Sequence, residues 1–222
     1  MVLTNIYIPV KDEEIDLLVT IKNIRKNTSD KITIVDNNSS DNSKKIALKY
    51  SDFVWDEFKL GKGNVVKKIL GETNADIIFL TDGDNTYDLT LYEQHKKMFI
   101  DENLDMLVGQ RNYDKKYLKR HERKIANKLF NLLFKLLMGG NYKDICSGYR
   151  FIKKLSFENI EILSKSFEIE TELSIFALKN KMKIKEVPIV YRERVISKSK
   201  LKTFKDSFKI ISFLIKNFLK NS

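Results

Sequence analysis

The stretch DIIFLTDGDN, residues 76–85, decides the fold class. Its apolar run predicts a short strand buried on both faces, which is typical of a parallel sheet covered by helices. Asp82 and Asp84 follow directly, where that strand would end. Ligands of open α/β sheets bind beyond the carboxyl ends of the strands, so we expect the chemistry of the protein at this place.

The same alternation of short apolar runs and helical patterns continues on both sides of this stretch. Pro9 and Asp36 fall at the ends of two further predicted strands. Strands and helices that alternate at this spacing predict an α/β fold with a mostly parallel sheet flanked by helices. We expect strands at 4–10, 31–35, 52–55, 76–80, 104–108 and 183–190, and helices at 13–26, 44–50, 64–70, 91–100, 123–138 and 203–220.

Two of the predicted helices, 123–138 and 203–220, carry apolar faces flanked by lysines. Gly139 and Gly140 supply a stop signal after the first of them. This pattern is typical of amphipathic helices that lie in a membrane interface. It also fits helices that pack on the core and leave their lysines in solvent. We expect the interfacial arrangement.

Charge is divided unevenly along the chain of 222 residues. The formal net charge is +11, but residues 1–110 hold 14 Lys and Arg against 19 Asp and Glu, whereas residues 111–222 hold 27 against 11. A protein that binds nucleic acid with its whole surface would not need this division. We therefore distinguish an acidic half, 1–110, from a basic half, 111–222, within one compact body.

Cysteine and hydropathy patterns indicate the compartment. Cys146 is the single cysteine, so no intramolecular disulfide forms and a reducing compartment fits. We expect no leader before the first predicted strand, and no apolar run approaches the ~20 residues that span a bilayer. We expect a cytoplasmic protein. His95 and His121 are isolated histidines without metal-site spacing, and we expect both at the surface.

The segment around Asp82 and Asp84 is a candidate metal site. Two carboxylates separated by one small residue can share Mg²⁺ or Mn²⁺, which takes its other ligands from waters and substrate phosphates. Such a segment also forms ordinary surface turns, and its position after a central strand favours the metal. The segment GKGN, 61–64, opens a predicted helix, where free N–H groups and Lys62 suit a diphosphate. It lacks the Walker pattern.

Taken in order, these motifs resemble those of the family 2 glycosyltransferases with the GT-A (Rossmann-like) fold, which use nucleotide sugars. The first half carries them as IPVKDEE at 8–14, VDNNSSD at 35–41, GKG at 61–63 and DGD at 82–84. The second half is similar to the dolichol- and polyprenol-phosphate sugar synthases, which load one sugar onto a lipid phosphate. Its motifs are GQR at 109–111, DICSGYR at 144–150, FEIETE at 167–172, EVPI at 186–189 and SKL at 199–201.

This resemblance implies a role for particular residues. In the acidic half, Asp84 would be the direct metal ligand and Asp82 would lie near the ribose and the metal. The residues implied in nucleotide binding are Pro9, Lys11, Glu13, Asp36, Lys62 and Asp82. In the basic half, those implied in binding the acceptor phosphate are Arg111, Arg123 and Lys200. Asp84, Arg111 and Arg194 would be the catalytic residues.

The sequence departs from the family pattern at several positions. Lys11 stands where relatives usually have an aromatic residue, which puts base stacking in doubt. Asn37 replaces the second Asp of a common pair, and Ile196 with Ser197 replaces Gly-Gly. Thr86 stands where some relatives offer a further ligand to the metal, a role that we do not assign to it.

A phosphate acceptor explains why arginines outnumber obvious bases among these motifs. A phosphate monoester has a second pKa of about 6 and is already largely dianionic at pH 7, so it needs positioning rather than deprotonation. Glu170 or Glu172 could instead serve as a base for a hydroxyl acceptor, or hold basic loops.

We therefore expect an inverting, metal-dependent transfer of sugar to dolichyl or polyprenyl phosphate at the cytoplasmic face of an anionic membrane. The motif variants favour UDP-GlcNAc or UDP-glucose over GDP-mannose as the donor. A family 2 enzyme with a glycan acceptor is the alternative. A nucleic-acid-binding module is a remote one, because it leaves the ordered motifs unexplained, and we expect no nucleic acid partner.

Overall fold

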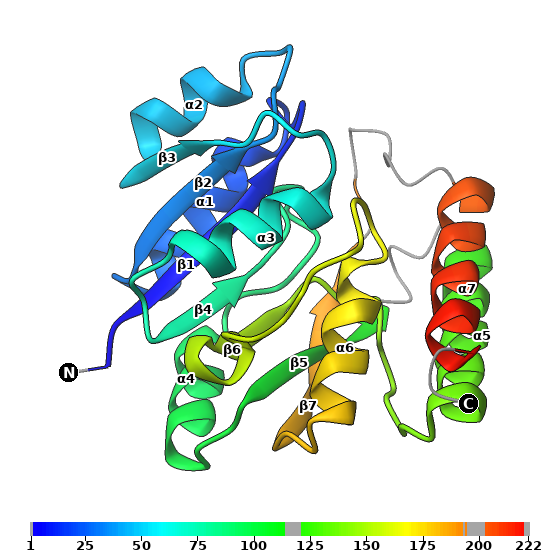
Figure 1. The fold of residues 1–222 in the computed structure, drawn as a ribbon. Coiled ribbons are helices and arrows are strands. Elements are labelled where there is room, and N and C mark those ends of the chain that lie inside the picture. Colours follow the sequence, from blue (N-terminus) through cyan, green and yellow to red (C-terminus); the bar gives the residue numbers. More distant parts are fainter. Residues whose placement is uncertain (1, 114–120, 193, 195–202, 220–222) are drawn as a thin grey trace.

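A seven-stranded sheet forms the centre of the protein (Figure 1). The structure is a computed structural model and describes residues 2–113, 121–192, 194 and 203–219. The strands run in the order β3-β2-β1-β4-β6-β5-β7, and β6 alone is antiparallel to its neighbours β4 and β5. Their bounds are β1 Thr4–Val10, β2 Lys31–Asp36, β3 Phe53–Asp56, β4 Ile77–Leu80, β5 Met106–Tyr113, β6 Arg150–Lys153 and β7 Ile184–Tyr191. The predicted α/β fold with a mostly parallel sheet is confirmed.

Helices cover both faces of this sheet, because successive strand residues point to opposite sides. Ile6 and Ile8 belong to one hydrophobic cluster with α1, α2 and α4, whereas Tyr7 belongs to a second cluster with α3, α5, α6 and α7. The helix bounds are α1 Leu17–Asn27, α2 Ser43–Tyr50, α3 Lys62–Glu72, α4 Tyr92–Asp101, α5 His121–Met138, α6 Ile169–Lys179 and α7 Thr203–Leu219, with a 3₁₀ turn at Lys154–Phe157. One sheet thus serves both halves of the chain, and the boundary at residue 110 falls inside β5.

The first helix begins later than the predicted residue 13. Asp12 has a φ of 50°, in the left-handed region, and its carboxylate accepts a hydrogen bond from the Ser40 amide. The Glu13 amide donates to Ser43 Oγ at 2.7 Å. These contacts with the loop before α2 hold residues 11–16 as a turn at the end of β1, so that α1 begins only at Leu17.

Strand β6 and helix α6 are the two elements that the sequence pattern does not predict. Arg150 opens β6 and is only 1% exposed, and its guanidinium donates to the carbonyls of Ser147 and Ile145 at 2.8 and 2.7 Å. In α6 the buried side chains include Glu170 and Glu172. Polar residues at buried positions interrupt the apolar periodicity from which both elements would be recognised.

His95 differs from its expected surface position. It is 4% exposed, in α4, and its Nδ1 lies 2.8 Å from Tyr149 Oη. Burial lowers the pKa of His95, because the charged imidazolium loses its hydration. His95 is therefore a neutral core residue that satisfies a buried tyrosine.

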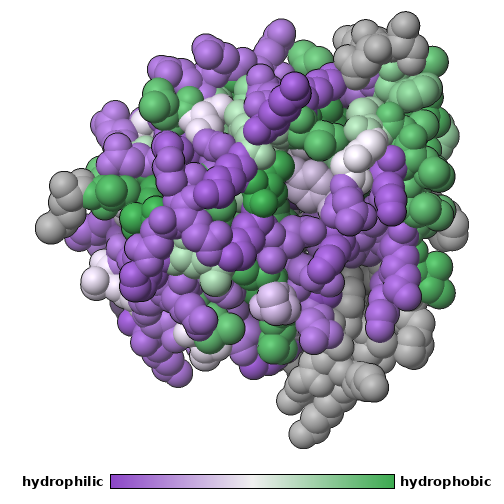
Figure 2. All heavy atoms as spheres, turned by 90° about the horizontal axis from the view of Figure 1, so that it is seen from below, coloured by the Kyte–Doolittle hydropathy of each residue, from purple (hydrophilic) through white to green (hydrophobic). Residues whose placement is uncertain are grey.

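Helices α5 and α7 pack against each other at one side of the molecule (Figure 1). Helix α5 ends as predicted at Met138, before Gly139 with a φ of 75°. Phe134 and Leu214 are fully buried on the inner side, whereas an outer stripe on α5 stays exposed. Apolar residues gather at this side in Figure 2, and the stripe consists of Ile125, Leu129, Leu132 and Leu136.

Helix α3 begins in close contact with the loop before α6, and Gly61 and Gly63 make this contact possible. A Cβ at Gly63 would lie 2.2 Å from the Ser164 carbonyl oxygen. A Cβ at Gly71, near the end of the same helix, would meet nothing within 4 Å.

We expect Gly63→Ala to lower the free energy of unfolding by about 1–3 kcal/mol, because backbone must move to admit the methyl group. The matched control Gly71→Ala should raise it by about 0.4–1 kcal/mol, since alanine restricts the unfolded chain and fits the helix. Urea unfolding followed by circular dichroism measures both. Equal stabilities of the two variants would contradict the close contact.

Candidate active site

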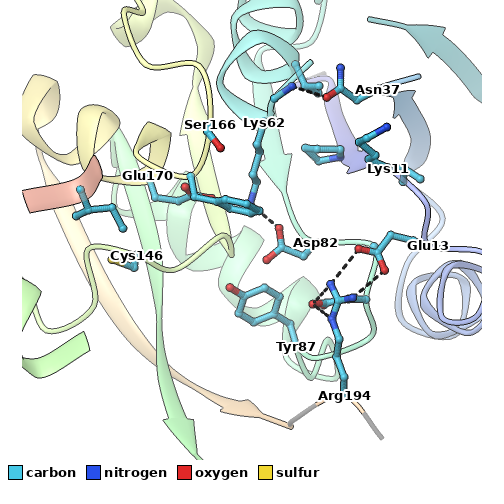
Figure 3. Close-up of a pocket in the computed structure, with 18 of the residues that line it drawn as sticks. Lys11, Glu13, Asn37, Lys62, Asp82, Tyr87, Cys146, Ser166, Glu170 and Arg194 are labelled. Carbon is cyan, nitrogen blue, oxygen red and sulfur yellow. Dashed lines mark hydrogen bonds and ion pairs between the residues drawn. The ribbon is translucent and has the colours of Figure 1, made fainter. Parts of the chain in front are cut away.

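A cavity of about 510 Å³ lies beyond the carboxyl ends of β1 and β4 and extends to α5 and α7 (Figure 3). Its lining is charged near the strand ends and apolar near the two helices, where it meets Ala126, Phe130 and Ile210. Eight of the predicted site residues line it: Pro9, Lys11, Glu13, Lys62, Asp82, Asp84, Arg111 and Arg194.

Lys62 is held between two carboxylates from distant parts of the chain. Its ammonium group lies 2.5 Å from Asp82 Oδ1 and 2.5 Å from Glu170 Oε1. Burial favours the neutral amine, but the two carboxylates prevail and raise the pKa of Lys62 above its ordinary value. Burial likewise opposes ionisation of Asp82, and the neighbouring Lys62 nevertheless lowers the pKa of that carboxyl. The predicted diphosphate lysine is thus fully charged at the N-terminus of α3.

Arg194 follows β7 and pairs with two carboxylates, one from the loop after β1 and one from the loop after β4. Its guanidinium donates to Asp84 Oδ2 at 2.8 Å and to both oxygens of Glu13 at 2.9 and 3.0 Å. Asp84 Oδ1 accepts two further hydrogen bonds from Thr86, through its hydroxyl group at 2.6 Å and its amide at 3.2 Å. Figure 3 shows Arg194 facing Glu13 with parallel contacts. Thr86 therefore orients the predicted metal ligand.

Arg111 forms a bidentate ion pair with Asp144. It is 14% exposed and donates to Asp144 through Nε and one terminal nitrogen, both at 2.8 Å, and through its amide at 3.0 Å. Its guanidinium also lies over the Tyr191 ring, 5.3 Å from the centroid. Glu186 accepts from the amides of Lys143 and Asp144, and so fixes the loop that presents the carboxylate.

Glu172 does not face the cavity as a base. It accepts hydrogen bonds from the amides of Leu163 and Ser164 at 2.8 and 2.9 Å and from the Ser164 hydroxyl group. Glu172 therefore fixes the segment against which Gly63 packs. Of the two glutamates considered as bases, one positions a loop and the other is paired with Lys62.

Asp36 and Asn37 at the end of β2 have different environments. Asp36 is 3% exposed and does not line the cavity; its Oδ2 accepts from the Ser39 amide, and its Oδ1 accepts no hydrogen bond among the described residues. Asn37 does line the cavity, and its amide donates to the carbonyls of Glu57 and Lys59 and accepts from the Gly61 amide. An aspartate could not make the two donations, which gives a physical reason for the departure at 37.

The other residues singled out from the sequence either line the cavity or lie outside the described part of the structure. Lys11 lines the cavity and donates to the Asn38 carbonyl at 2.9 Å. Cys146 also lines it, and burial raises the pKa of its thiol to about 12, so it stays protonated at neutral pH. Arg123 belongs to the first turn of α5, but its side chain lies outside the described part of the structure, as does Lys200. Ile196 and Ser197, which replace Gly-Gly of the family pattern, lie outside it as well.

The residues at the end of β4 fit a divalent cation. Asp82 and Asp84 supply the hard oxygen atoms that Mg²⁺ and Mn²⁺ prefer, and both line the cavity. Gly148 keeps space beside them, because a Cβ there would lie 2.8 Å from Asp82 Oδ2. Among the described residues no group of three or more His, Cys, Asp or Glu side chains could hold a metal. A cation here would therefore need further ligands from a substrate and water.

Comparison with known proteins agrees with this geometry. The family model described as Glycosyl transferase family 2 matches residues 5–161. The chain belongs to this family. The predicted membership of family 2 is thereby confirmed, and the sheet with its flanking helices is the GT-A fold.

Several curated proteins are similar to this chain. Glycosyltransferase AglJ of Haloferax volcanii is 28% identical over 190 residues, which cover 84% of this chain and 62% of AglJ. An uncharacterized protein of Methanocaldococcus jannaschii, MJ1222, is 29% identical over 218 residues, which cover 93% of this chain and 90% of that protein. Protein RfbJ of Shigella flexneri is 33% identical over 118 residues, 52% of this chain and 92% of RfbJ. The chain thus spans less than two thirds of AglJ.

Solved structures show the same fold at low identity. Glucosyl-3-phosphoglycerate synthase from Mycobacterium tuberculosis, in complex with Mn²⁺, UDP and phosphoglyceric acid, has a TM-score of 0.79 and 17% identity, covering 97% of this chain and 78% of that one. A complex of the same synthase with Mn²⁺ and UDP-glucose has a TM-score of 0.77 and 18% identity, covering 96% and 78%.

The Arg111–Asp144 pair makes a stability prediction. We expect Asp144→Asn to lower the free energy of unfolding at pH 7 by about 1–3 kcal/mol, because one amide oxygen cannot replace a carboxylate that accepts three hydrogen bonds. The control is Asp101→Asn, which breaks the exposed pair of Asp101 with Lys97 and should cost no more than about 0.5 kcal/mol. Chemical unfolding of both variants measures these two changes in the free energy of unfolding. A loss at Asp144 as small as at Asp101 would contradict a tightly held Arg111.

Proposed function

We propose that the protein transfers a sugar from a nucleotide sugar to dolichyl or polyprenyl phosphate, with inversion and with the help of a divalent metal ion. One observation carries this proposal. A single cavity joins the charged groups at the strand ends to an apolar lining of Val65, Ala126, Phe130 and Ile210. An acceptor that combines a phosphate with a hydrocarbon chain matches both ends of such a cavity.

The acidic half has the groups that a nucleoside diphosphate sugar requires. Lys62 lies in the first turn of α3, where unpaired N–H groups add to its positive charge. Together with Arg194 it can balance the charge that develops on the leaving diphosphate. The Mn²⁺, UDP and UDP-glucose complexes of the glucosyl-3-phosphoglycerate synthase support a uridine nucleotide here. UDP-GlcNAc and UDP-glucose are the favoured donors and GDP-mannose the less favoured one.

The proposed metal ion is Mg²⁺ or Mn²⁺, with Asp84 as its direct ligand and Asp82 beside it. Such an ion supplies Lewis acid chemistry at the diphosphate when it is bound. Thr86 holds Asp84 in place through two hydrogen bonds to Oδ1. Arg194 supplies positive charge at the other oxygen. Both oxygens of the Asp84 carboxylate therefore have partners that orient them.

The acceptor needs cations more than it needs a base. A lipid phosphate is largely dianionic at pH 7, so one of its oxygens can attack the anomeric carbon without losing a proton. Arg111 lines the same cavity as the apolar residues, so it can position this phosphate. Glu170 and Glu172 are engaged with Lys62 and with residues 163–164. Direct displacement by the phosphate oxygen inverts the configuration of the sugar.

The membrane part of the proposal concerns the outer surface of α5 and α7. Exposed apolar residues on both helices, such as Leu136 at 70% and Phe208 at 73%, lie among exposed lysines. Such a surface suits the interface of an anionic membrane, which would present the lipid phosphate to the adjoining end of the cavity. No described helix has the length and apolar character required to cross a bilayer. We propose that the protein binds at the cytoplasmic face.

The decisive experiment combines the protein, Mg²⁺ or Mn²⁺, a polyprenyl phosphate and a panel of nucleotide sugars, followed by mass spectrometry of the lipid. We expect one lipid-linked sugar, formed with release of the nucleoside diphosphate. Asp84→Ala should reduce kcat by about 100-fold or more, because charge on the leaving group loses its stabilisation. Arg111→Ala should raise KM for the lipid phosphate by about 10- to 150-fold through the lost charged hydrogen bonds.

Two results would contradict this assignment. Full activity of Asp84→Ala would remove the metal role. Transfer to a soluble glycan that is unaffected by Arg111→Ala would show a hydroxyl acceptor, which is the alternative function within the family. Salt-dependent binding to nucleic acid without any affinity for nucleotide sugars would remove the proposal altogether.

The proposed membrane-binding surface of the protein is tested with substitutions of two exposed leucines. Leu136→Asp should weaken binding to vesicles that contain anionic phospholipid by about 10-fold or more, because it removes apolar area from the contact and adds a repelled charge. Leu48→Asp is the control, because Leu48 is 66% exposed on α2 at the other side of the molecule (Figure 1). Co-sedimentation measures both. Equal binding of the two variants would contradict docking through α5.

A further inference from the structure

Tyr87 is a buried tyrosine of the cavity to which no motif assigns a role. It is 6% exposed and lies three residues after Asp84. Its ring packs edge-on against Tyr149 and Tyr191, with centroid distances of 6.1 and 5.3 Å. Figure 3 shows its hydroxyl end turned into the cavity, away from Arg194.

The backbone around Tyr87 is pinned to the end of β7. Tyr87 forms an isolated antiparallel bridge with Tyr191. On either side of it, the Asp88 amide donates to the Val190 carbonyl at 3.0 Å, and the Arg192 amide donates to the Thr86 carbonyl at 2.8 Å. These contacts leave the side chain little freedom, so its hydroxyl group has a defined place in the cavity.

The Tyr87 hydroxyl group has an unused hydrogen-bond donor. Its oxygen accepts from the Gly148 amide at 2.8 Å. Among the described residues, nothing accepts the hydroxyl proton. A tyrosine hydroxyl group ordinarily has a pKa of about 10 and therefore carries its proton at neutral pH. A fixed donor that stays protonated and is aimed at a cavity points to a ligand acceptor.

The position of this donor indicates which part of the ligand it meets. Gly148, which holds the Tyr87 oxygen, also borders the Asp82 carboxylate. The Tyr87 ring packs against the Tyr191 ring, and the Arg111 guanidinium lies over the same Tyr191 ring. Through Gly148 and Tyr191, Tyr87 therefore adjoins both sides of the interval between the residues proposed for the diphosphate and metal and the arginine proposed for the acceptor phosphate. In a direct displacement, the transferred sugar occupies that interval.

We propose that Tyr87 binds the transferred sugar by donating a hydrogen bond from its hydroxyl group to a sugar hydroxyl oxygen. This inference rests on the proposed function, since it needs a nucleotide sugar in the cavity. It makes Tyr87 a specificity-determining residue, because a buried donor discriminates against a sugar that places no oxygen opposite it. Uncharged donors of this kind orient a sugar without disturbing the charge balance of Lys62 and Asp84.

The test compares a nucleotide sugar with its nucleoside diphosphate, which lacks the sugar. Calorimetry in the presence of Mn²⁺ gives Kd for UDP-glucose, UDP-GlcNAc and UDP, and for GDP-mannose and GDP. For the pair that the wild type binds, Tyr87→Phe should raise Kd of the nucleotide sugar about 3- to 10-fold, the range of one hydrogen bond. Kd of the nucleoside diphosphate should change less than about twofold.

Tyr149→Phe is the matched control. It removes a hydroxyl group from the adjoining ring, where the oxygen contacts His95 and not the cavity. We expect its ligand affinities to equal those of the wild type. Thermal unfolding of both variants shows whether the aromatic cluster remains intact.

Other outcomes separate this inference from the proposed function. Wild-type protein that binds none of the nucleotides would contradict the proposed function itself. If the wild type binds, then equal losses for nucleotide sugar and nucleoside diphosphate would place the hydroxyl group at the diphosphate and overturn the inference. Unchanged affinity for both ligands would overturn it as well. An increase confined to KM for polyprenyl phosphate would move the contact to the acceptor, against the proposal.

Discussion

The ion pairs of one buried ammonium group hold the cavity together. Lys62, at the start of α3, lies between Asp82 at the end of β4 and Glu170 in α6. Neither carboxylate would be stable in this buried place without the cation, and the cation would lose its proton without them. These ion pairs therefore connect α3 and the end of β4, in the acidic half of the chain, to α6 in the basic half. Gly63 permits the required approach of α3, and Glu172 fixes the loop on the other side.

The two arginines of the cavity follow the same rule. Arg194 is satisfied by Glu13 and Asp84, and Arg111 by Asp144. Each pair connects segments that are far apart in the sequence, so the cavity forms only when the whole sheet has formed. A phosphate that enters this cavity meets arginines whose geometry is already set, which reduces the entropy that binding must overcome. These carboxylates thus position the arginines, in addition to the role in metal binding that is proposed for Asp84.

Much of this arrangement follows from local sequence, and the remainder depends on tertiary contacts. The apolar run of β1 determines its strand directly, and the strand-end motifs indicate the side of the sheet where eight site residues meet. Strand β6 is not recognised from the sequence because Arg150 is buried, and its guanidinium donates to Ser174 Oγ, a partner that is distant in sequence. The roles of Asn37 and Tyr87 are hidden for the same reason, since their partners Gly61 and Gly148 are distant in sequence.

These ion pairs indicate where the excess positive charge of the basic half lies. Within the described cavity, the arginines of the basic half are offset by Glu13, Asp84 and Asp144. The excess of positive charge in residues 111–222 must therefore reside mainly outside it. Exposed lysines on α5 and α7 account for part of that excess: Lys124, Lys128, Lys135, Lys209 and Lys216. In the proposed function, long-range attraction to an anionic surface and local recognition of a phosphate are then separate tasks. Added salt screens the first because those lysines face solvent, and it affects the buried arginines much less.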